Sequence, residues 1–140
     1  MISIEKDNLI FIRLLPEENI IHEIKKACKK HNIVTGIVIS AVGQFKSATL
    51  GYFKNKGDYT DQMFNRPLEI LSITGNILYQ ENDYMLHLHT VLSDEKKQAI
   101  GGHLINGTIS VTAEIVILKT SIKISRKYND ETGLMDLSFP

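Results

Sequence analysis

The chain has 140 residues, of which 43% are hydrophobic and 23% charged, a composition typical of a globular protein and unlike that of a disordered chain. Sixteen basic and sixteen acidic residues give a formal net charge of zero, which disfavours tight non-specific binding to DNA. The single cysteine, Cys28, excludes a disulfide within the chain and fits a reducing compartment. No apolar stretch resembles a signal sequence or could span a bilayer, so we expect one cytoplasmic domain, residues 1–140, with no membrane partner.

The first part of the chain predicts a strand followed by the main helix. Residues 8–15 are rich in apolar side chains and predict a strand that ends at Pro16. Residues 17–31 repeat apolar side chains at helical spacing, with acidic residues near the start and basic residues near the end. We expect Cys28 to be a small core residue on the apolar side of this helix, and His22 to lie exposed on its polar side.

The middle of the chain predicts strands separated by turns. Residues 33–41 are nearly continuously apolar and predict a strand that is buried on both faces and ends at 42–44. Residues 48–53 predict a third strand, whereas the polar residues 54–64 predict a loop. A long strand is expected from 66 to 79, with Glu69, Leu71 and Ile73 on one face. It is joined by a hairpin turn at 80–83 to the next, antiparallel strand.

The last part of the chain predicts a long strand over residues 108–118 and two short closing strands, 122–128 and 134–137, around a turn at 129–133. In total the pattern predicts one main helix and about six or seven strands, mostly joined by hairpins. This is an α+β fold with a largely antiparallel sheet.

Two histidine motifs are the most informative feature for function. His87-Leu88-His89 lies in a predicted strand, where alternate side chains share a face, so His87 and His89 should point together. In Gly101-Gly102-His103, the glycine pair indicates unusual backbone angles or a close approach in a loop that returns His103 to the same point. Three neutral imidazoles suit zinc or a similar divalent transition metal; the alternative is three structural, hydrogen-bonded histidines.

Four charged residues are candidates for catalytic or binding roles at such a site. Glu69 and Glu114 are carboxylates within largely apolar strands, where they are candidates for a general base or for orienting a metal ligand. Arg13 and Arg66 are candidates for binding a substrate carboxylate. The alternative for each is a structural ion pair.

Four motifs in order resemble those of the PPC domain, the plants and prokaryotes conserved domain. Residues 66–75 resemble its Gly-Arg-Phe-Glu-Ile-Leu-Ser-x-x-Gly signature, with Asn65 in place of the Gly, Pro67-Leu68 in place of one Phe, and Arg66 displaced by one position. The resemblance extends from Arg13 to about Leu137. The other three motifs are Leu86-His87-Leu88-His89, Gly101-Gly102-His103-Leu104 and Thr112-Ala113-Glu114.

The resemblance implies a compact α+β domain that assembles as a homotrimer. In plants this domain is joined to AT-hook segments that bind AT-rich DNA, and it mediates assembly and contacts with transcription factors. This chain lacks an Arg-Gly-Arg-Pro core and is similar to a stand-alone prokaryotic form, so a DNA or transcription-factor partner would rest on analogy. The fold is also that of acetolactate decarboxylases, which hold zinc with three histidines in an arrangement similar to His87, His89 and His103.

Two hypotheses for function follow. The first is a trimeric regulatory or interaction module in which a metal at His87, His89 and His103 is a structural or ligand-sensing centre. The second is a metal-dependent enzyme acting on a small carboxylated metabolite, because three histidine ligands leave a coordination position open for a small-molecule ligand or water. No uniquely placed proton donor accompanies the histidines, so the sequence favours the first.

Overall fold

The computed structural model describes residues 1–140 and contains one helix and nine strands. Seven strands form a sheet in the order β1-β2-β7-β6-β5-β3-β4, and β8 and β9 form a separate hairpin. Every strand pairing is antiparallel, which confirms the expected α+β architecture. The elements are β1 (Ile2–Lys6), β2 (Leu9–Leu14), α1 (Ile20–Lys30), β3 (Thr35–Asn55), β4 (Asp58–Phe64), β5 (Leu68–Gln80), β6 (Asp83–Ser93), β7 (Ala99–Thr120), β8 (Ser125–Asn129) and β9 (Leu134–Ser138).

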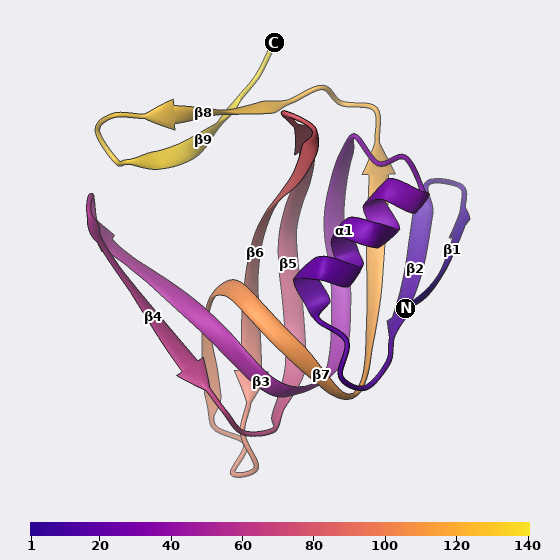
Figure 1. Ribbon diagram of the computed structural model, residues 1–140, viewed down its shortest axis with the longest axis vertical. Helices are drawn as coiled ribbons and strands as arrows, with labels where there is room; N and C mark the ends of the chain where they lie inside the picture. The colour runs from indigo at the N-terminus through magenta and orange to yellow at the C-terminus, as the bar shows by residue number, and fades with distance from the viewer.

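The two longest strands, β3 and β7, organise the sheet, because each pairs with three others. The pairings β7–β6, β6–β5, β5–β3 and β3–β7 form a closed circuit, which is visible as the strongly curved part of the sheet in Figure 1. The expected break at 42–44 is wrong, because β3 continues through it with register shifts against β7. Such bulges bend a strand without ending it.

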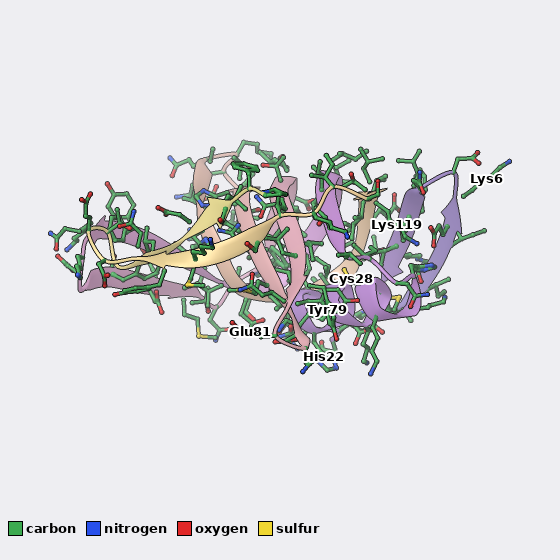
Figure 2. All side chains as sticks on the ribbon, turned by 90° about the horizontal axis from the view of Figure 1, so that it is seen from above. Lys6, His22, Cys28, Tyr79, Glu81 and Lys119 are labelled. Atoms are coloured by element: carbon green, nitrogen blue, oxygen red, sulfur yellow. The ribbon has the colours of Figure 1, made fainter.

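Helix α1 covers one face of the sheet (Figure 1). It begins three residues later than predicted, because Glu17 has a left-handed backbone (φ 68°) and Asn19 is the N-cap, accepting a hydrogen bond from the His22 N–H at 3.1 Å. As predicted, Cys28 is fully buried and His22 is exposed on the outer side of the helix (Figure 2). Burial raises the pKa of the Cys28 thiol to about 12. The helix has 11 residues, and the chain contains no helix long and apolar enough to cross a membrane.

Two edge strands differ from the sequence prediction. Residues 2–6 form β1, for which the sequence analysis predicted no strand, and residues 58–64 form β4 within the predicted loop. Both lie at opposite edges of the sheet and are largely solvent-exposed. In β1, Ile2 and Ile4 alternate with polar residues, a short strand signal that the prediction missed, whereas β4 lies in a mostly polar segment.

The sheet face opposite the helix is uncovered, so the prediction that residues 33–41 are buried on both faces is wrong. Ile37 is 40% exposed, whereas its neighbour Val38 packs into the core. A register shift between Ile70 and Ser72 also breaks the alternation expected in β5: Ile73 is buried and Leu71 is exposed. The hairpin turn between β5 and β6 forms as expected at Glu81 and Asn82, which both have positive φ angles.

Candidate metal centre

Strands β6 and β7 bring three histidines to one point. His87 and His89 lie on the same face of β6, and Leu88 between them packs into the core on the other face. His103 lies on β7, directly opposite His89 in the strand pairing. Each histidine has a ring nitrogen within 4.8 Å of those of the other two, and the Nε2 atoms of His87 and His89 are 3.2 Å apart. The three side chains that the sequence predicted to converge therefore lie together in the structure.

The glycine pair permits a close approach within strand β7, and not in a returning loop as the sequence analysis expected. A Cβ atom on Gly101 would lie 2.7 Å from the Thr90 carbonyl oxygen. A Cβ atom on Gly102 would lie 2.9 Å from the Gly51 carbonyl oxygen. Strand β7 can therefore pass closely by both β6 and β3 here, which places His103 beside His89.

The environment favours neutral imidazoles. His87 is exposed at the groove, and partial burial of its ring is the main cause that lowers its pKa, to which the charge of Arg126 adds. Burial also lowers the pKa of His103, followed by the neighbouring His89. Neutral imidazole is the form that binds a metal ion, so both residues are ready to act as ligands near neutral pH.

The donor set fits a transition metal. It consists of three imidazoles and contains no carboxylate or thiolate, which suits zinc or a related divalent ion and is unlike the oxygen-rich sites of Ca²⁺ or Mg²⁺. Three protein ligands leave at least one coordination position for a small molecule.

The histidines open into a groove of about 1200 Å³. One wall comes from β3 and β4 and includes Tyr52, Phe53 and Tyr59; the Tyr59 ring stands edge-on to His103, with centroids 6.3 Å apart. The other wall comes from the β8–β9 hairpin, which lies by the turn end of β5 and β6 in Figure 1.

Arg126 on β8 is a groove residue that the sequence analysis did not identify. Its backbone is held by Gln80, whose Oε1 accepts from the Arg126 N–H at 2.8 Å and whose Nε2 donates to the Arg126 carbonyl at 3.1 Å. Its side chain reaches Asn76, the strand partner of His87. No local motif marks Arg126, because its place at the site depends on how the hairpin docks on β5.

None of the four charged candidates from the sequence lines the groove. Glu69 is exposed and accepts a hydrogen bond from Gln44 Nε2 at 2.7 Å. Arg66 pairs with Asp94, Nη2 to Oδ2, at 3.8 Å. Arg13 and Glu114 are strand partners on the uncovered face of the sheet. The structure therefore brings none of these side chains to the histidines.

The protein is similar to two curated proteins. Both are called Bifunctional protein GlmU and come from two Synechococcus strains, JA-2-3B'a(2-13) and JA-3-3Ab. They are 32% and 30% identical to this chain over 128 residues, which is 90% of the chain but 19% and 20% of the relatives. The chain thus spans about a fifth of the length of the curated relatives that it matches.

Solved structures share the whole fold. A presumed DNA-binding protein from Bacteroides thetaiotaomicron is 28% identical, with a TM-score of 0.92 over 98% of this chain and 96% of that one. A plant- and prokaryote-conserved (PPC) protein from Pyrococcus horikoshii is 28% identical, with a TM-score of 0.81 over 91% and 90%. A metal-containing protein from Archaeoglobus fulgidus is 24% identical, with a TM-score of 0.84 over 96% and 95%, a likeness that shows the fold alone.

A more distant likeness confirms the expected relation to the acetolactate-decarboxylase fold. A Staphylococcus aureus protein described as similar to alpha-acetolactate decarboxylase is 14% identical, with a TM-score of 0.56 over 79% of this chain and 52% of that one. The family model of the Plants and Prokaryotes Conserved (PCC) domain, the PPC domain of the motifs above, matches residues 1–121. With its model matched over most of the chain and its motifs present in order, the chain belongs to the Plants and Prokaryotes Conserved domain family.

Proposed function

We propose that this single-domain protein is a homotrimeric, metal-binding PPC module that acts in regulation or molecular interaction in the cytoplasm. The observation that carries the proposal is the convergence of His87, His89 and His103. These three residues would hold zinc or a similar divalent ion, which would supply a positively charged coordination point for a small-molecule ligand. The Archaeoglobus protein is described as metal-containing, but the metal proposal for this chain rests on its own three histidines.

Metal content tests this proposal directly. The purified protein is depleted of metal with a chelator and then incubated with zinc. Elemental mass spectrometry should then find about one zinc ion per chain. His89→Ala should lose the ion, because it removes one of the three ligands, whereas His22→Ala should retain it, because His22 is exposed on α1 away from the site. Equal zinc content in wild-type protein and His89→Ala would contradict the proposal.

The uncovered face of the sheet supports self-association. On this face, Ile4, Phe11 and Val116 form a continuous row across β1, β2 and β7, and Phe11 is 55% exposed. Large exposed apolar patches on a globular protein mark interaction surfaces. A second row beside it contains Ile2, Arg13, Glu114 and Val42 across four adjacent strands.

A second copy of the chain is the occupant we propose for this face. Its apolar rows would bury against those of the neighbouring copies, and the opposite charges of Arg13 and Glu114 would give the contact its orientation. Sedimentation equilibrium of the purified protein should give three times the mass of 15.8 kDa. A monomeric mass at micromolar concentration would exclude the trimer.

DNA as a partner rests on analogy with the family and on the name of the Bacteroides protein. The zero net charge of this chain weighs against a dominant phosphate contact. Direct binding predicts an electrophoretic shift that weakens steeply with salt. A transcription-factor partner is the alternative within the same proposal, and it predicts no shift of DNA by this chain alone, even at low salt.

A second candidate function is a metal-dependent enzyme that acts on a small carboxylated metabolite. The groove that opens at the three histidines favours it, because a substrate needs access to the metal. Zinc-loaded protein should then release carbon dioxide from 2-acetolactate, and His89→Ala should not. If both proteins release carbon dioxide at the same slow rate, the enzyme function is contradicted, and the regulatory or interaction module is the only proposed function that remains.

A further inference from the structure

Arg126 is a buried cation without a direct ion-pair partner. The residue is only 8% exposed. Its Nη1 donates to the Met135 carbonyl at 2.7 Å and its Nη2 donates to the Asn76 Oδ1 at 2.6 Å, and both acceptors are neutral. No carboxylate oxygen lies within 4.0 Å of its guanidinium. A buried charge normally has an opposite charge in contact with it. Here burial lowers the pKa of Arg126, and Asp136 partly opposes this through its charge but makes no ion-pair contact with the guanidinium.

The remaining donors of Arg126 are available to a ligand. A guanidinium has five N–H groups, and the two hydrogen bonds use only one on each Nη atom. Arg126 lines the same groove as the three histidines, and its Asn76 contact places it beside the strand partner of His87. A negatively charged group in the groove can therefore reach both the guanidinium and the histidine cluster.

The rest of the groove limits what the ligand can be. Its walls are mostly apolar, with aromatic side chains from β3 and β4 and leucines from the C-terminal hairpin, which favours an apolar portion on the ligand. Asp136 also lines the groove and accepts a hydrogen bond from Asn129 Nδ2 at 2.7 Å. Its negative charge disfavours a second negative charge on the ligand.

We propose that the groove binds an organic monocarboxylate with an apolar portion, and that Arg126 pairs with the carboxylate. The role that the sequence analysis gave to Arg13 and Arg66 thus passes to a residue of the β8–β9 hairpin, which lies beyond the residues matched by the family model. This inference rests on the proposed function, because the carboxylate lies in the groove of the proposed metal site.

The experiment is a titration of the full chain with phenylacetate, monitored by nuclear magnetic resonance. A parallel titration uses phenylacetamide as the uncharged probe of the same shape. Each titration is done on zinc-loaded and on chelator-treated protein, and zinc content is measured on the same samples. The variants are Arg126→Gln, which removes the charge, and Arg126→Lys, which keeps it without the planar fork. The matched control is Lys127→Gln, which removes the same charge from the next residue of β8, whose side chain is exposed and does not line the groove.

Phenylacetate should bind wild-type protein, and phenylacetamide should bind more weakly. Arg126→Gln should weaken phenylacetate binding by roughly tenfold to hundredfold, because a hydrogen bond to a charged group is lost. Arg126→Lys should keep part of the affinity, and Lys127→Gln should stay near wild type.

Two results would overturn the inference: equal phenylacetate affinity in wild type and Arg126→Gln, or equal losses of phenylacetate and phenylacetamide affinity in Arg126→Gln. The second would mean that Arg126 only holds the hairpin. Absence of zinc from wild-type protein would instead contradict the metal proposal. In that case the chelator-treated titrations still decide the role of Arg126 by the same comparison.

Discussion

His89 on β6 and His103 on β7 face each other directly in an antiparallel strand pair, and Gly101 pairs with Val91 two positions further along. The histidine cluster therefore depends on the register of these two strands. A slip of one residue would turn His103 to the opposite face of β7 and take a ligand away from the other two.

Substitution of Gly101 tests this dependence on register. In Gly101→Ala the new Cβ would meet the Thr90 carbonyl oxygen, so the β6–β7 pairing must shift. We expect a loss of about 1–3 kcal/mol in the free energy of unfolding and weaker zinc binding. Urea unfolding and a zinc competition titration measure the two effects. Ala99→Val, at an exposed position at the start of the same strand, is the control and should leave zinc affinity unchanged. If Gly101→Ala binds zinc with wild-type affinity, the prediction is contradicted, because the histidine cluster would then tolerate a shift in the β6–β7 pairing.

Zinc affinity should fall in acid, at a pH that the environment of the histidines determines. Protons compete with zinc for imidazole nitrogens, and burial lowers the pKa values of His87 and His103 below the ordinary value of 6.5. Protonation of His87 and His103 should therefore reduce zinc affinity only below about pH 6.5. Competition titrations over this range measure the decline. A decline that begins well above pH 6.5 would contradict lowered pKa values.

The stability of the metal-free protein should depend on pH in the same direction. Between the lowered pKa values and 6.5, the unfolded chain binds protons at His87 and His103 more readily than the folded chain does. The free energy of unfolding should therefore fall as pH decreases through this window. Substituting Gln for both histidines should reduce that slope, which urea titrations at several pH values will show.

Phe11 tests the proposed subunit interface. Phe11→Asp places a charge in the apolar row of the uncovered face, where it would be buried if copies of the chain meet there. We expect the trimer to dissociate, as measured by sedimentation equilibrium, with little change in the far-ultraviolet circular dichroism spectrum. Ile122→Asp is the control, because Ile122 is similarly exposed but lies between β7 and β8. A trimer that survives Phe11→Asp would place the interface elsewhere.

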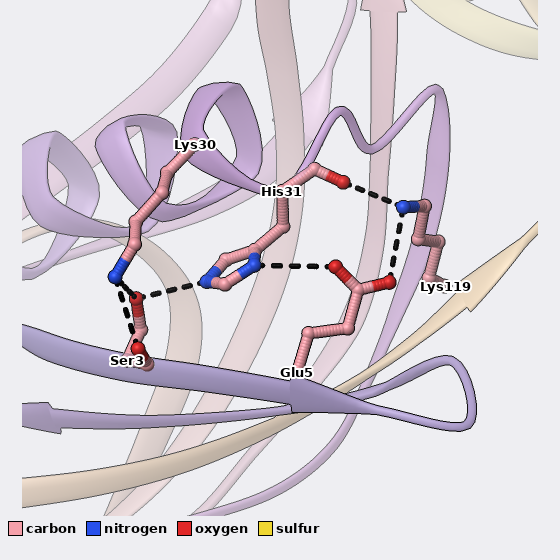
Figure 3. A network of polar contacts seen from close by, with 5 residues as sticks. All are labelled: Ser3, Glu5, Lys30, His31 and Lys119. Atoms are coloured by element: carbon pink, nitrogen blue, oxygen red, sulfur yellow. Dashed lines mark hydrogen bonds and ion pairs between the residues drawn. The ribbon is translucent and has the colours of Figure 1, made fainter.

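A polar network holds the N-terminal hairpin against the helix (Figure 3). Glu5 on β1 accepts a hydrogen bond from Lys119 Nζ at 3.0 Å, and its other oxygen lies 3.2 Å from His31 Nδ1. His31 Nε2 is 2.9 Å from Ser3 Oγ, and the His31 carbonyl accepts from Lys119 Nζ at 2.6 Å. The network thus links β1, the end of α1 and the end of β7.

Glu5→Gln should destabilise the protein in a pH-dependent way. The hydrogen bond from Lys119 is the main cause that lowers the pKa of Glu5 below 4.5. Its stabilising effect is therefore complete above that value and is lost as pH falls through the lowered pKa. The difference in urea midpoint between wild type and Glu5→Gln should be present at neutral pH and shrink in acid. Glu81→Gln, in the exposed β5–β6 turn, should show no such difference (Figure 2).

The parts of the fold that the sequence predicted are those with local signals. The apolar stripe of α1, the β5–β6 turn and the alternation of His87 with Leu88 all depend on neighbours within a few residues. Edge strand β1 alternates only two apolar residues with polar ones, and β4 lies in a mostly polar segment, so their local signals are weak. Strands β3 and β7 contain bulges where the pattern slips, so their bounds could not be predicted in the same way.

The sequence alone determined the α+β class, the family and the identity of the three histidines, because strand periodicity places His87 and His89 on one face whatever surrounds them. Only the tertiary structure decided which charged residue accompanies them. Arg13, Arg66, Glu69 and Glu114 turned out to lie elsewhere, and Arg126 reaches the groove through contacts with Gln80 and Asn76. Such contacts join segments far apart in the chain, and their geometry follows from how the hairpin docks and not from any local spacing of residues.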